Sequence, residues 1–458
     1  MGGTMTTRPC RLLFVITLAA SVLGSGRAQG KVIDDGPHHR NELSTIRDAL
    51  KRSGTHPLHI LYVHGIGATG AGDSHMFLTG ICPLLQGCKA PKKKDDWHPV
   101  KTEYADRGDF AGDSPLPAFE YLGQRVWTTP DEWRDSAPFV AHYVLQRSDG
   151  GPVVVDEINW WPLVFPLKCR QIMANEARLA GPDKDFLRLC SGQQELDPDS
   201  PGRTYAWITP KDAHDLESIR PKGALINRGL KNFPLDWGFS DAIMAVGSMH
   251  DLFREAMRQM FVESVRFMTD GSDSEAWKRR LKDSEIDREF IVVSHSLGSY
   301  LVFSTLNMDQ PISALQDVTQ PERSAATMEE DDAARYILER TTLLYFFANQ
   351  VPLLELANLA IPQAAGSLSK RMMKWKELRQ SFLRNHPSDQ AAAKPQVVAW
   401  SDPSDLLTWR VPQIGDLVID NLYVRNTWWH WLFAWPTAVH DGYAQNRDVL
   451  RAMLPKAQ

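Results

Sequence analysis

Hydrophobic and polar residues follow one another along the chain in blocks that predict strands alternating with helices. The first clear block is the apolar run at residues 58–63, and later runs of strand length lie at 289–294, 342–348, 396–400 and 422–425. Residues 297–306 carry the pattern of a helix. Strands that alternate with helices predict an α/β protein with a mostly parallel central sheet and helices on both faces.

A longer helical pattern lies between residues 241 and 270, where apolar residues recur at steps of three and four. This spacing predicts one helix whose apolar face packs on the core. Residues 353–365 are also apolar and leave two alternatives open, a core helix or a lid over a site. We therefore expect a helical excursion at residues 353–395.

The region from residue 80 to residue 240 differs in composition, with many Pro, Asp and Trp residues. It predicts one β-hairpin, because β-rich runs at 141–146 and 153–158 flank the turn Ser-Asp-Gly-Gly. The rest of the region is typical of a large insertion after the first core strand rather than of a second domain. We therefore expect one domain at residues 29–458, preceded by a short leader segment at residues 1–28.

The N-terminus has the features of a secretory signal peptide. Arg8 and Arg11 precede an apolar run at residues 12–23, and Gly26 and Ala28 occupy the small-residue positions of a cleavage site. The run is shorter than a membrane-spanning helix requires, and an uncleaved anchor is the alternative. Removal of residues 1–28 would leave a secreted or periplasmic protein.

Four cysteines remain after residue 28, namely Cys82, Cys88, Cys169 and Cys190. An even number of cysteines in an exported chain indicates disulfides. Of the alternative connectivities, the simplest pairs neighbours in sequence, Cys82 with Cys88 and Cys169 with Cys190. A zinc site is the rival interpretation, but the chain has no C-x-x-C pair and His75 is the histidine nearest to the first two cysteines.

Composition and charge narrow the class of partner. The formal net charge of −5 argues against a general nucleic-acid binder, which carries a basic face. The chain has 15 tryptophans, with clusters at residues 160–161 and 428–435. We interpret these clusters as packing between the insertion and the core, with an acyl-binding wall or a lipid-contacting surface as the alternative.

The strongest candidate for a reactive residue lies in residues 291–300, which read Ile-Val-Val-Ser-His-Ser-Leu-Gly-Ser-Tyr. This stretch is expected to join a buried strand to a helix. Ser296 lies at the junction, with Ser294 two positions before it and Gly298 two positions after it. A serine at the apex of such a sharp turn needs small residues at both positions, because strand and helix crowd together there. The alternative is a serine that only caps the helix.

This stretch resembles the nucleophile elbow of the α/β-hydrolase superfamily, in particular its lipase- and esterase-like members. The family pattern is G-x-S-x-G, and Ser294 replaces the first glycine here. The resemblance covers the core elements at residues 57–80 and 241–450 and not the insertion. It implies the α/β-hydrolase fold, a nucleophilic Ser296, and the chain order nucleophile, acid, histidine.

The resemblance also implies an acid after a late strand and a histidine after the last one. His440, just before the C-terminal helix, is the favoured base, and His430 in the Trp-rich stretch is the alternative. His295, beside the serine, is expected to point away from it and to be structural. Asp405 is the favoured acid because apolar residues after it can anchor its loop, and Asp402 is the alternate.

The stretch His64-Gly65-Ile66, after the first strand, is similar to the loop that supplies one oxyanion donor in this family. The donors that the resemblance implies are the backbone N–H of Leu297 and that of Gly65 or Ile66. Residues 65–70 also fit the G-x-G-x-x-G pattern of dinucleotide-binding turns. A nucleotide site is not favoured, because no acidic residue ends a second strand about 20 residues later.

The sequence therefore predicts an exported serine hydrolase that cleaves a carboxylic ester of a small molecule or lipid through an acyl-serine, with no metal or organic cofactor. Transient contact with a lipid surface is an accompanying expectation. Amide and thioester hydrolysis would use the same residues. A non-catalytic binding protein on this fold is the alternative from another class of function.

Overall fold

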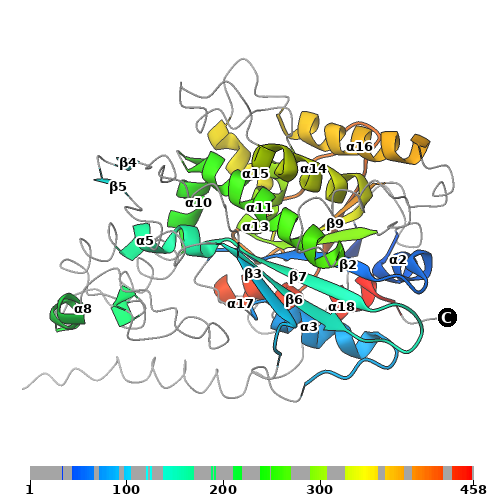
Figure 1. Ribbon diagram of the computed structural model, residues 1–458, viewed down its shortest axis with the longest axis horizontal. Coiled ribbons are helices and arrows are strands. Elements are labelled where there is room, and N and C mark those ends of the chain that lie inside the picture. Colours follow the sequence, from blue (N-terminus) through cyan, green and yellow to red (C-terminus); the bar gives the residue numbers. More distant parts are fainter. Residues whose placement is uncertain are drawn as a thin grey trace, which may run out of the picture.

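The computed structural model describes residues 33–34, 44–66, 72–91, 97–104, 120–121, 124–125, 138–169, 187–188, 190–191, 210–218, 238–247, 249–269, 289–306, 325–358, 367–385, 395–426 and 436–455 (Figure 1). The predicted signal peptide, residues 1–28, lies outside these ranges.

A central sheet organises the described part of the chain. Its nine described strands lie in the order β1-β11-β10-β9-β8-β2-β7-β6-β3. Neighbouring strands from β11 to β7 are parallel, whereas β1, β6 and β3 pair antiparallel. The mostly parallel α/β sheet that the sequence predicts is thus confirmed. The strand bounds are β1 Ile33–Asp34, β2 Leu58–Val63, β3 Lys101–Tyr104, β6 Phe139–Leu145, β7 Val153–Asn159, β8 Phe290–His295, β9 Thr341–Phe347, β10 Gln396–Ser401 and β11 Val418–Tyr423, with a separate pair β4 Glu120–Tyr121 and β5 Gln124–Arg125.

Helices cover both faces of this sheet (Figure 1). On one face α10, α11, α13, α14 and α16 share a hydrophobic core with the sheet, and on the other α2, α3 and α18 do so. Side chains along β2 alternate between these two cores, as the two-residue period of a strand requires. The helix bounds are α2 Ile46–Ser53, α3 His75–Ile81, η2 Cys82–Leu84, η5 Trp161–Leu163, α5 Phe165–Leu167, α8 Pro210–Glu217, α10 Ser240–Val246, α11 His250–Thr269, α13 Leu297–Thr305, α14 Ala325–Arg340, α15 Val351–Leu354, η8 Glu355–Asn358, α16 Ser367–Asn385, α17 Pro436–Asp441, η10 Gly442–Gln445 and α18 Arg447–Met453.

Two elements differ from the sequence prediction. The single helix expected at 241–270 is two helices, α10 and α11, because the backbone of Gly247 leaves the helical region at the end of α10. The last strand begins at Val418 rather than at residue 422. Asp420 and Asn421 interrupt the apolar pattern there, and Asn421 uses its amide to bond both backbone groups of Val411.

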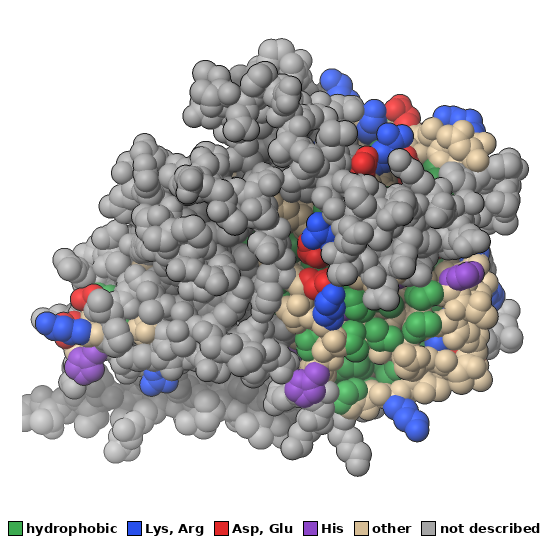
Figure 2. Space-filling model, viewed as in Figure 1, with side chains coloured by type: hydrophobic (Ala, Val, Ile, Leu, Met, Phe, Trp, Pro, Cys, Tyr) green, Lys and Arg blue, Asp and Glu red, His purple; other side chains and the backbone are tan. Residues whose placement is uncertain are grey.

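The predicted hairpin forms and joins the central sheet. Strands β6 and β7 pair antiparallel, and β7 lies parallel to β2 along its whole length. Part of the segment that the sequence assigns to an insertion therefore extends the sheet. Figure 2 shows hydrophobic side chains gathered on the described surface at the lower right of the view.

Cys82 is bonded to Cys88 and Cys169 to Cys190, the connectivity that the sequence favours. The sulfur–sulfur distances are 2.04 and 1.98 Å. In the part of the chain that the structure describes, no helix has the length and apolar character needed to cross a membrane.

Helix α16 lies within the excursion expected at 353–395, of which residues 359–366 and 386–394 lie outside the described residues. It packs against α14 and buries Met372 and Trp375 completely. Helix α16 therefore behaves as a core-covering helix. Trp160 and Trp161 are also buried, in line with the packing interpretation of that tryptophan pair.

A buried ionic cluster joins the hairpin strands to α11. Nδ1 of His142 lies 2.7 Å from Asp156 and its Nε2 lies 3.2 Å from Glu103, while Nδ1 of His59 approaches Asp156 at 3.5 Å. The His142 ring stacks on Phe267 of α11. Burial disfavours the imidazolium, but the two carboxylates outweigh it and raise the pKa of His142 to about 9.

This cluster should make the fold sensitive to alkaline pH. Because the pKa of His142 is raised from 6.5 to about 9, its stabilising contribution is complete below pH 6.5 and is lost as the pH rises through 9. We expect Tm to fall between about pH 7 and about pH 10, and to fall less in His142→Gln, which is already destabilised because Asp156 has lost its cation. His56→Gln, at an exposed histidine, is the matched control. A wild-type Tm that is constant over this range would contradict the expectation.

Candidate active site

Ser296 sits in a strained turn between β8 and α13. Its φ of 52° is in the left-handed region, which a residue other than glycine occupies only where the surroundings hold it there. Its N–H donates to the carbonyl of Phe347 on β9 at 2.8 Å. A Cβ on Gly298 would lie 2.4 Å from the carbonyl oxygen of His64, so this position admits only glycine.

The position of Ser294 explains why it can replace a glycine. Its side chain is buried, and its hydroxyl donates to Ser299 at 3.0 Å. The small side chain fits between strand and helix, and its polar atom has a partner.

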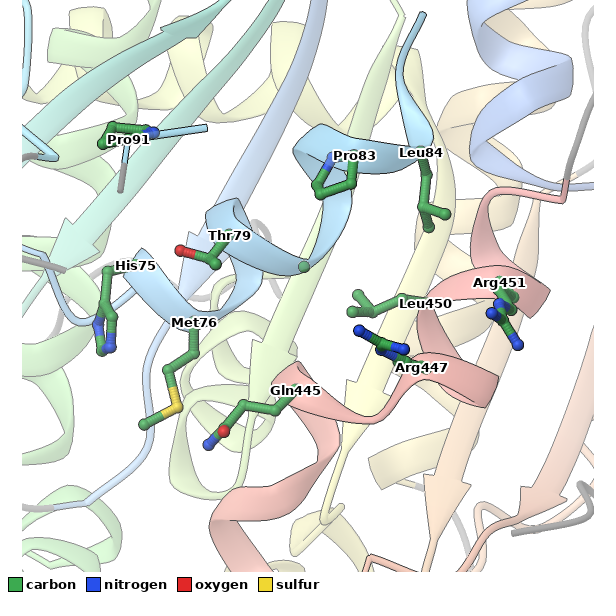
Figure 3. Close-up of a pocket in the computed structure, with 11 residues that line it drawn as sticks. His75, Met76, Thr79, Pro83, Leu84, Pro91, Gln445, Arg447, Leu450 and Arg451 are labelled. Carbon is green, nitrogen blue, oxygen red and sulfur yellow. The ribbon is translucent and has the colours of Figure 1, made fainter. Parts of the chain in front are cut away.

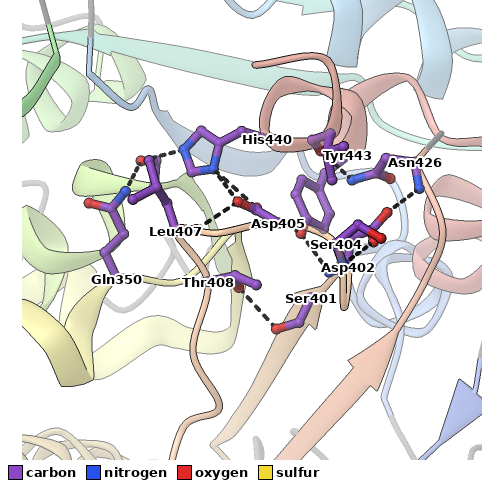
Figure 4. A network of polar contacts seen from close by, with 12 residues as sticks. Gln350, Ser401, Asp402, Ser404, Asp405, Leu407, Thr408, Asn426, His440 and Tyr443 are labelled. Atoms are coloured by element: carbon purple, nitrogen blue, oxygen red, sulfur yellow. Dashed lines mark hydrogen bonds and ion pairs between the residues drawn. The ribbon is translucent and has the colours of Figure 1, made fainter. Parts of the chain in front are cut away.

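Ser296, His440 and Asp405 form a continuous hydrogen-bonded chain (Figure 4). His440 Nε2 lies 2.8 Å from Ser296 Oγ. His440 Nδ1 lies 3.0 Å from each carboxylate oxygen of Asp405. All three residues are buried. This arrangement can take a proton from a serine hydroxyl and stabilise the resulting imidazolium.

The two candidate acids have different environments. Burial favours the neutral form of Asp405, but bonds from His440, the N–H of Leu407 and the Tyr443 hydroxyl outweigh it and lower its pKa. Burial raises the pKa of Asp402, and the negative charge of Asp405 adds to the rise. The structure therefore presents an ionised Asp405 to His440.

Asp402 contacts backbone groups instead of the imidazole. Its carboxylate accepts the N–H of Ser404 at 2.8 Å and that of Asn426 at 2.6 Å. The Asn426 side chain in turn donates to the carbonyl of Val439 at 2.8 Å. Asp402 thus helps to hold the segment that carries His440 (Figure 4).

Tyr443 joins the same loops. Its hydroxyl accepts the N–H of Asp402 at 2.7 Å and donates to Asp405 at 3.1 Å. Pattern reasoning did not identify this residue, because its partners come from a loop about 40 positions earlier in the chain.

The His295 side chain contacts the segment that carries His440. Its Nε2 donates to the backbone carbonyl of His440 at 2.8 Å, and the two rings lie 5.0 Å apart. Burial lowers the pKa of His295, and the neighbouring His440 adds to this effect. His430, the alternative base, lies outside the described residues.

The loop after β2 lies against the serine. A Cβ on Gly65 would be 2.8 Å from the Cβ of Ser296, so the backbone of this loop approaches Ser296 too closely for any residue but glycine. His64 is buried, which lowers its pKa to about 3, and its Nδ1 is 2.8 Å from the carbonyl of Gly65. Leu297 is the first residue of α13, so its N–H has no acceptor inside the helix.

The end of the glycine-rich loop binds a carboxylate of the protein itself. Glu157, on β7, accepts the N–H groups of Gly72, Asp73 and Ser74 at 3.0 to 3.2 Å, together with the Ser74 hydroxyl. Gly67 and Gly70 lie outside the described residues. The cluster of N–H donors that could otherwise attract a phosphate is thus already occupied.

Gln350 is a site residue that sequence reasoning missed. Its side-chain Nε2 donates to Ser296 Oγ at 2.8 Å (Figure 4). A signal was present in the sequence, because Asn349 and Gln350 are polar residues just after the buried strand β9. The ends of parallel strands meet at one edge of a sheet, which is where ligands bind in open α/β folds.

The cavity between α3 and α18 is separate from these residues (Figure 3). Its volume is about 590 Å³, and its lining combines Met76 and Leu450 with Arg447 and Arg451. None of the residues around Ser296 lines it. Within the described ranges, no group of three or more His, Cys, Asp or Glu side chains is placed to hold a metal ion.

Comparison of the chain with family models, with curated proteins and with solved structures finds no match. The function has to be inferred from the geometry of the site itself.

Substitutions at the two small positions of the turn should destabilise the protein to different extents. Gly298→Ala places a methyl group against the carbonyls of Val63 and His64, so we expect it to lower the free energy of unfolding by about 3 kcal/mol or to prevent folding. Ser294→Gly loses one buried hydrogen bond and should cost about 1 kcal/mol. Chemical denaturation of both variants measures this difference. Equal stabilities would contradict the packing described for the turn.

Proposed function

We propose that the protein is an exported serine hydrolase of the α/β-hydrolase fold that cleaves carboxylic esters. The observation that supports this most directly is the chain of hydrogen bonds from Asp405 through His440 to Ser296. The strained turn that carries Ser296 and the order of the three residues along the sequence are further support. The two disulfides fit an oxidising compartment.

In the proposed reaction, Ser296 Oγ attacks the ester carbonyl carbon while His440 Nε2 takes the hydroxyl proton. The carbonyl π electrons move to the oxygen, which becomes an oxyanion. When the intermediate collapses, the bond to the leaving alcohol breaks and that oxygen takes the proton from His440. Water repeats the sequence on the acyl-serine, and Oγ recovers its proton as the acid leaves.

The oxyanion would lie between Leu297 and the loop after β2. The free N–H at the start of α13 and the close approach of Gly65 to Ser296 support these donors. The bond from His64 fixes the Gly65 carbonyl. Because N–H and C=O of a trans peptide point in opposite directions, this bond also fixes the N–H of Ile66. Two such donors lower the barrier by several kcal/mol.

A fluorophosphonate probe, which phosphonylates an activated serine, tests the proposal. We expect the wild-type protein to be labelled at Ser296 and Ser296→Ala to be unlabelled. Asp405→Asn should slow labelling by about three to four orders of magnitude, because the imidazole loses the carboxylate that fixes its tautomer. Asp402→Asn is the matched control and should stay within about tenfold of wild type, since the bonds of the Asp402 carboxylate go to Ser404 and to the N–H of Asn426 and not to His440.

If folded wild-type protein resists the probe, the proposal fails and a non-catalytic binding protein becomes the better interpretation. If the wild-type protein is labelled, its rates on an ester, an amide and a thioester of the same acyl group decide which bond is cleaved.

Exposed hydrophobic side chains support an apolar or lipid-like ester. Phe239 is 49% exposed, Ile243 56% and Leu356 62%, and we call these three residues the apolar rim. Phe239 directly precedes α10, Ile243 lies on α10 and Leu356 lies on η8, and these two helices contact each other. Gly238, just before the rim, packs against Ile66, and η8 follows α15, whose preceding residue Gln350 contacts Ser296. Exposed apolar groups beside a reactive centre favour apolar partners.

Polar substitution of the apolar rim should separate soluble from aggregated substrates. In the triple variant Phe239→Ser, Ile243→Ser, Leu356→Ser we expect hydrolysis of a micellar long-chain ester to fall about tenfold or more, because apolar burial is lost. Hydrolysis of a short-chain soluble ester should change less than about twofold. Val100→Ser, at a residue 60% exposed beside the edge strand β3, is the control. Equal losses on both substrates would count against lipid contact.

A further inference from the structure

We propose that Gln350 is a catalytic hydrogen-bond donor to Ser296 Oγ, a role that rests on the proposed function and goes beyond the three residues of the Asp405–His440–Ser296 chain. Gln350 is buried, and its Nε2 lies 2.8 Å from the nucleophilic oxygen. That distance equals the one between His440 Nε2 and the same oxygen. The serine hydroxyl is therefore held from two sides.

The identities of the neighbouring atoms decide which way each proton points. Asp405 is a carboxylate and can only accept, so His440 carries its proton on Nδ1 and leaves Nε2 as an acceptor. The hydroxyl proton of Ser296 must then go to His440 Nε2. Oγ has only lone pairs left for a second partner, so Gln350 must present its N–H group and not its carbonyl oxygen.

The backbone around Gln350 is fixed from three directions. The neighbouring Phe347 carbonyl accepts the N–H of Ser296, which ties the end of β9 to the turn. Asn349 exchanges bonds with the backbone of Trp409, in the loop that follows Asp405. The carbonyl of Gln350 accepts the N–H groups of Leu353 and Leu354 in α15. The backbone that carries the carboxamide is thus fixed, and the bond to Ser296 Oγ orients the carboxamide itself.

This donor acts on a different atom from the oxyanion donors. When Oγ gives its proton to His440 and begins to attack, negative charge develops on Oγ, and the N–H of Gln350 stabilises it. In the acyl-serine Oγ is an ester oxygen, which accepts hydrogen bonds weakly. When that ester is hydrolysed, the C–Oγ bond breaks and charge returns to Oγ, so the same N–H stabilises the leaving oxygen before His440 returns the proton.

Two variants of nearly the same size test the role. Gln350→Met keeps the length of the side chain and removes the donor. Gln350→Glu keeps the shape, but its ionised carboxylate accepts only, and it draws the Ser296 proton away from His440. Gln413→Glu, at an exposed glutamine, controls for the added charge. The measurements are the fluorophosphonate labelling rate and kcat and KM on a soluble ester, each across a pH series, with Tm as the measure of folding.

We expect Gln350→Met to lower kcat and the labelling rate by about tenfold to a hundredfold with little change in KM or Tm. Gln350→Glu should be slower still at neutral pH. Its rate relative to wild type should rise as the pH falls, because a protonated carboxyl group again offers a donor. A side chain that only supports the fold would not give this pH dependence.

Wild-type rates in a folded Gln350→Met variant, or a Gln350→Glu to wild-type ratio that is constant with pH, would overturn the role of Gln350 and leave the serine hydrolase intact. An unlabelled, inactive wild type would overturn both.

Discussion

The left-handed backbone of Ser296 is the constraint on which the candidate site depends. A side chain in this conformation costs about 1 to 3 kcal/mol, which the surrounding structure must offset. The bond from its N–H to Phe347 holds the turn to β9, and Gly298 allows α13 to begin against the carbonyls at the end of β2. One turn therefore brings the ends of β2, β8 and β9 together and leaves the serine hydroxyl at their junction.

The remaining polar groups of the site come from loops that bond to one another. Asn349 is tied to Trp409, Tyr443 to Asp402 and Asp405, and His295 to the carbonyl of His440. Because most of these groups are buried, an unmade bond would cost about 1 to 3 kcal/mol, which is more than a made bond contributes, so the loops are stable only in mutual contact. The geometry around His440 is consequently a property of the whole loop cluster.

The need of buried polar groups for hydrogen-bond partners also explains the contacts at the end of the glycine-rich segment after β2. Its pattern is that of a phosphate-binding turn, yet the N–H groups at residues 72–74 bind the carboxylate of Glu157. This internal bond orients the start of α3 and ties it to β7. Residues 72–74 therefore tie the beginning of α3 to the hairpin that extends the sheet.

The sequence by itself was sufficient wherever a structure depends on neighbours along the chain. The strand β2, the hairpin and the turn at Ser296 follow from local periodicity and turn chemistry. Spacing only favoured the sequential cysteine pairs among three connectivities, and the structure contains those pairs. The sequence also ranked Asp405 ahead of Asp402, because apolar residues after Asp405 can anchor its loop, and His440 ahead of His430, which lies in an aromatic stretch. The tertiary structure then brought Asp405 to His440, while His430 lies outside the described residues.

Only the tertiary structure decided the contacts between distant segments. Gln350 reaches Ser296 across 54 positions, and Glu157 reaches Gly72 across 85. No local pattern encodes such pairs, because they arise from the order of the strands in the sheet and from the registers between them. Helix α10 likewise ends at Gly247 although the apolar period continues, since backbone geometry at one residue overrides the period on either side. Periodicity determines which face of an element is buried, whereas packing determines which side chains meet.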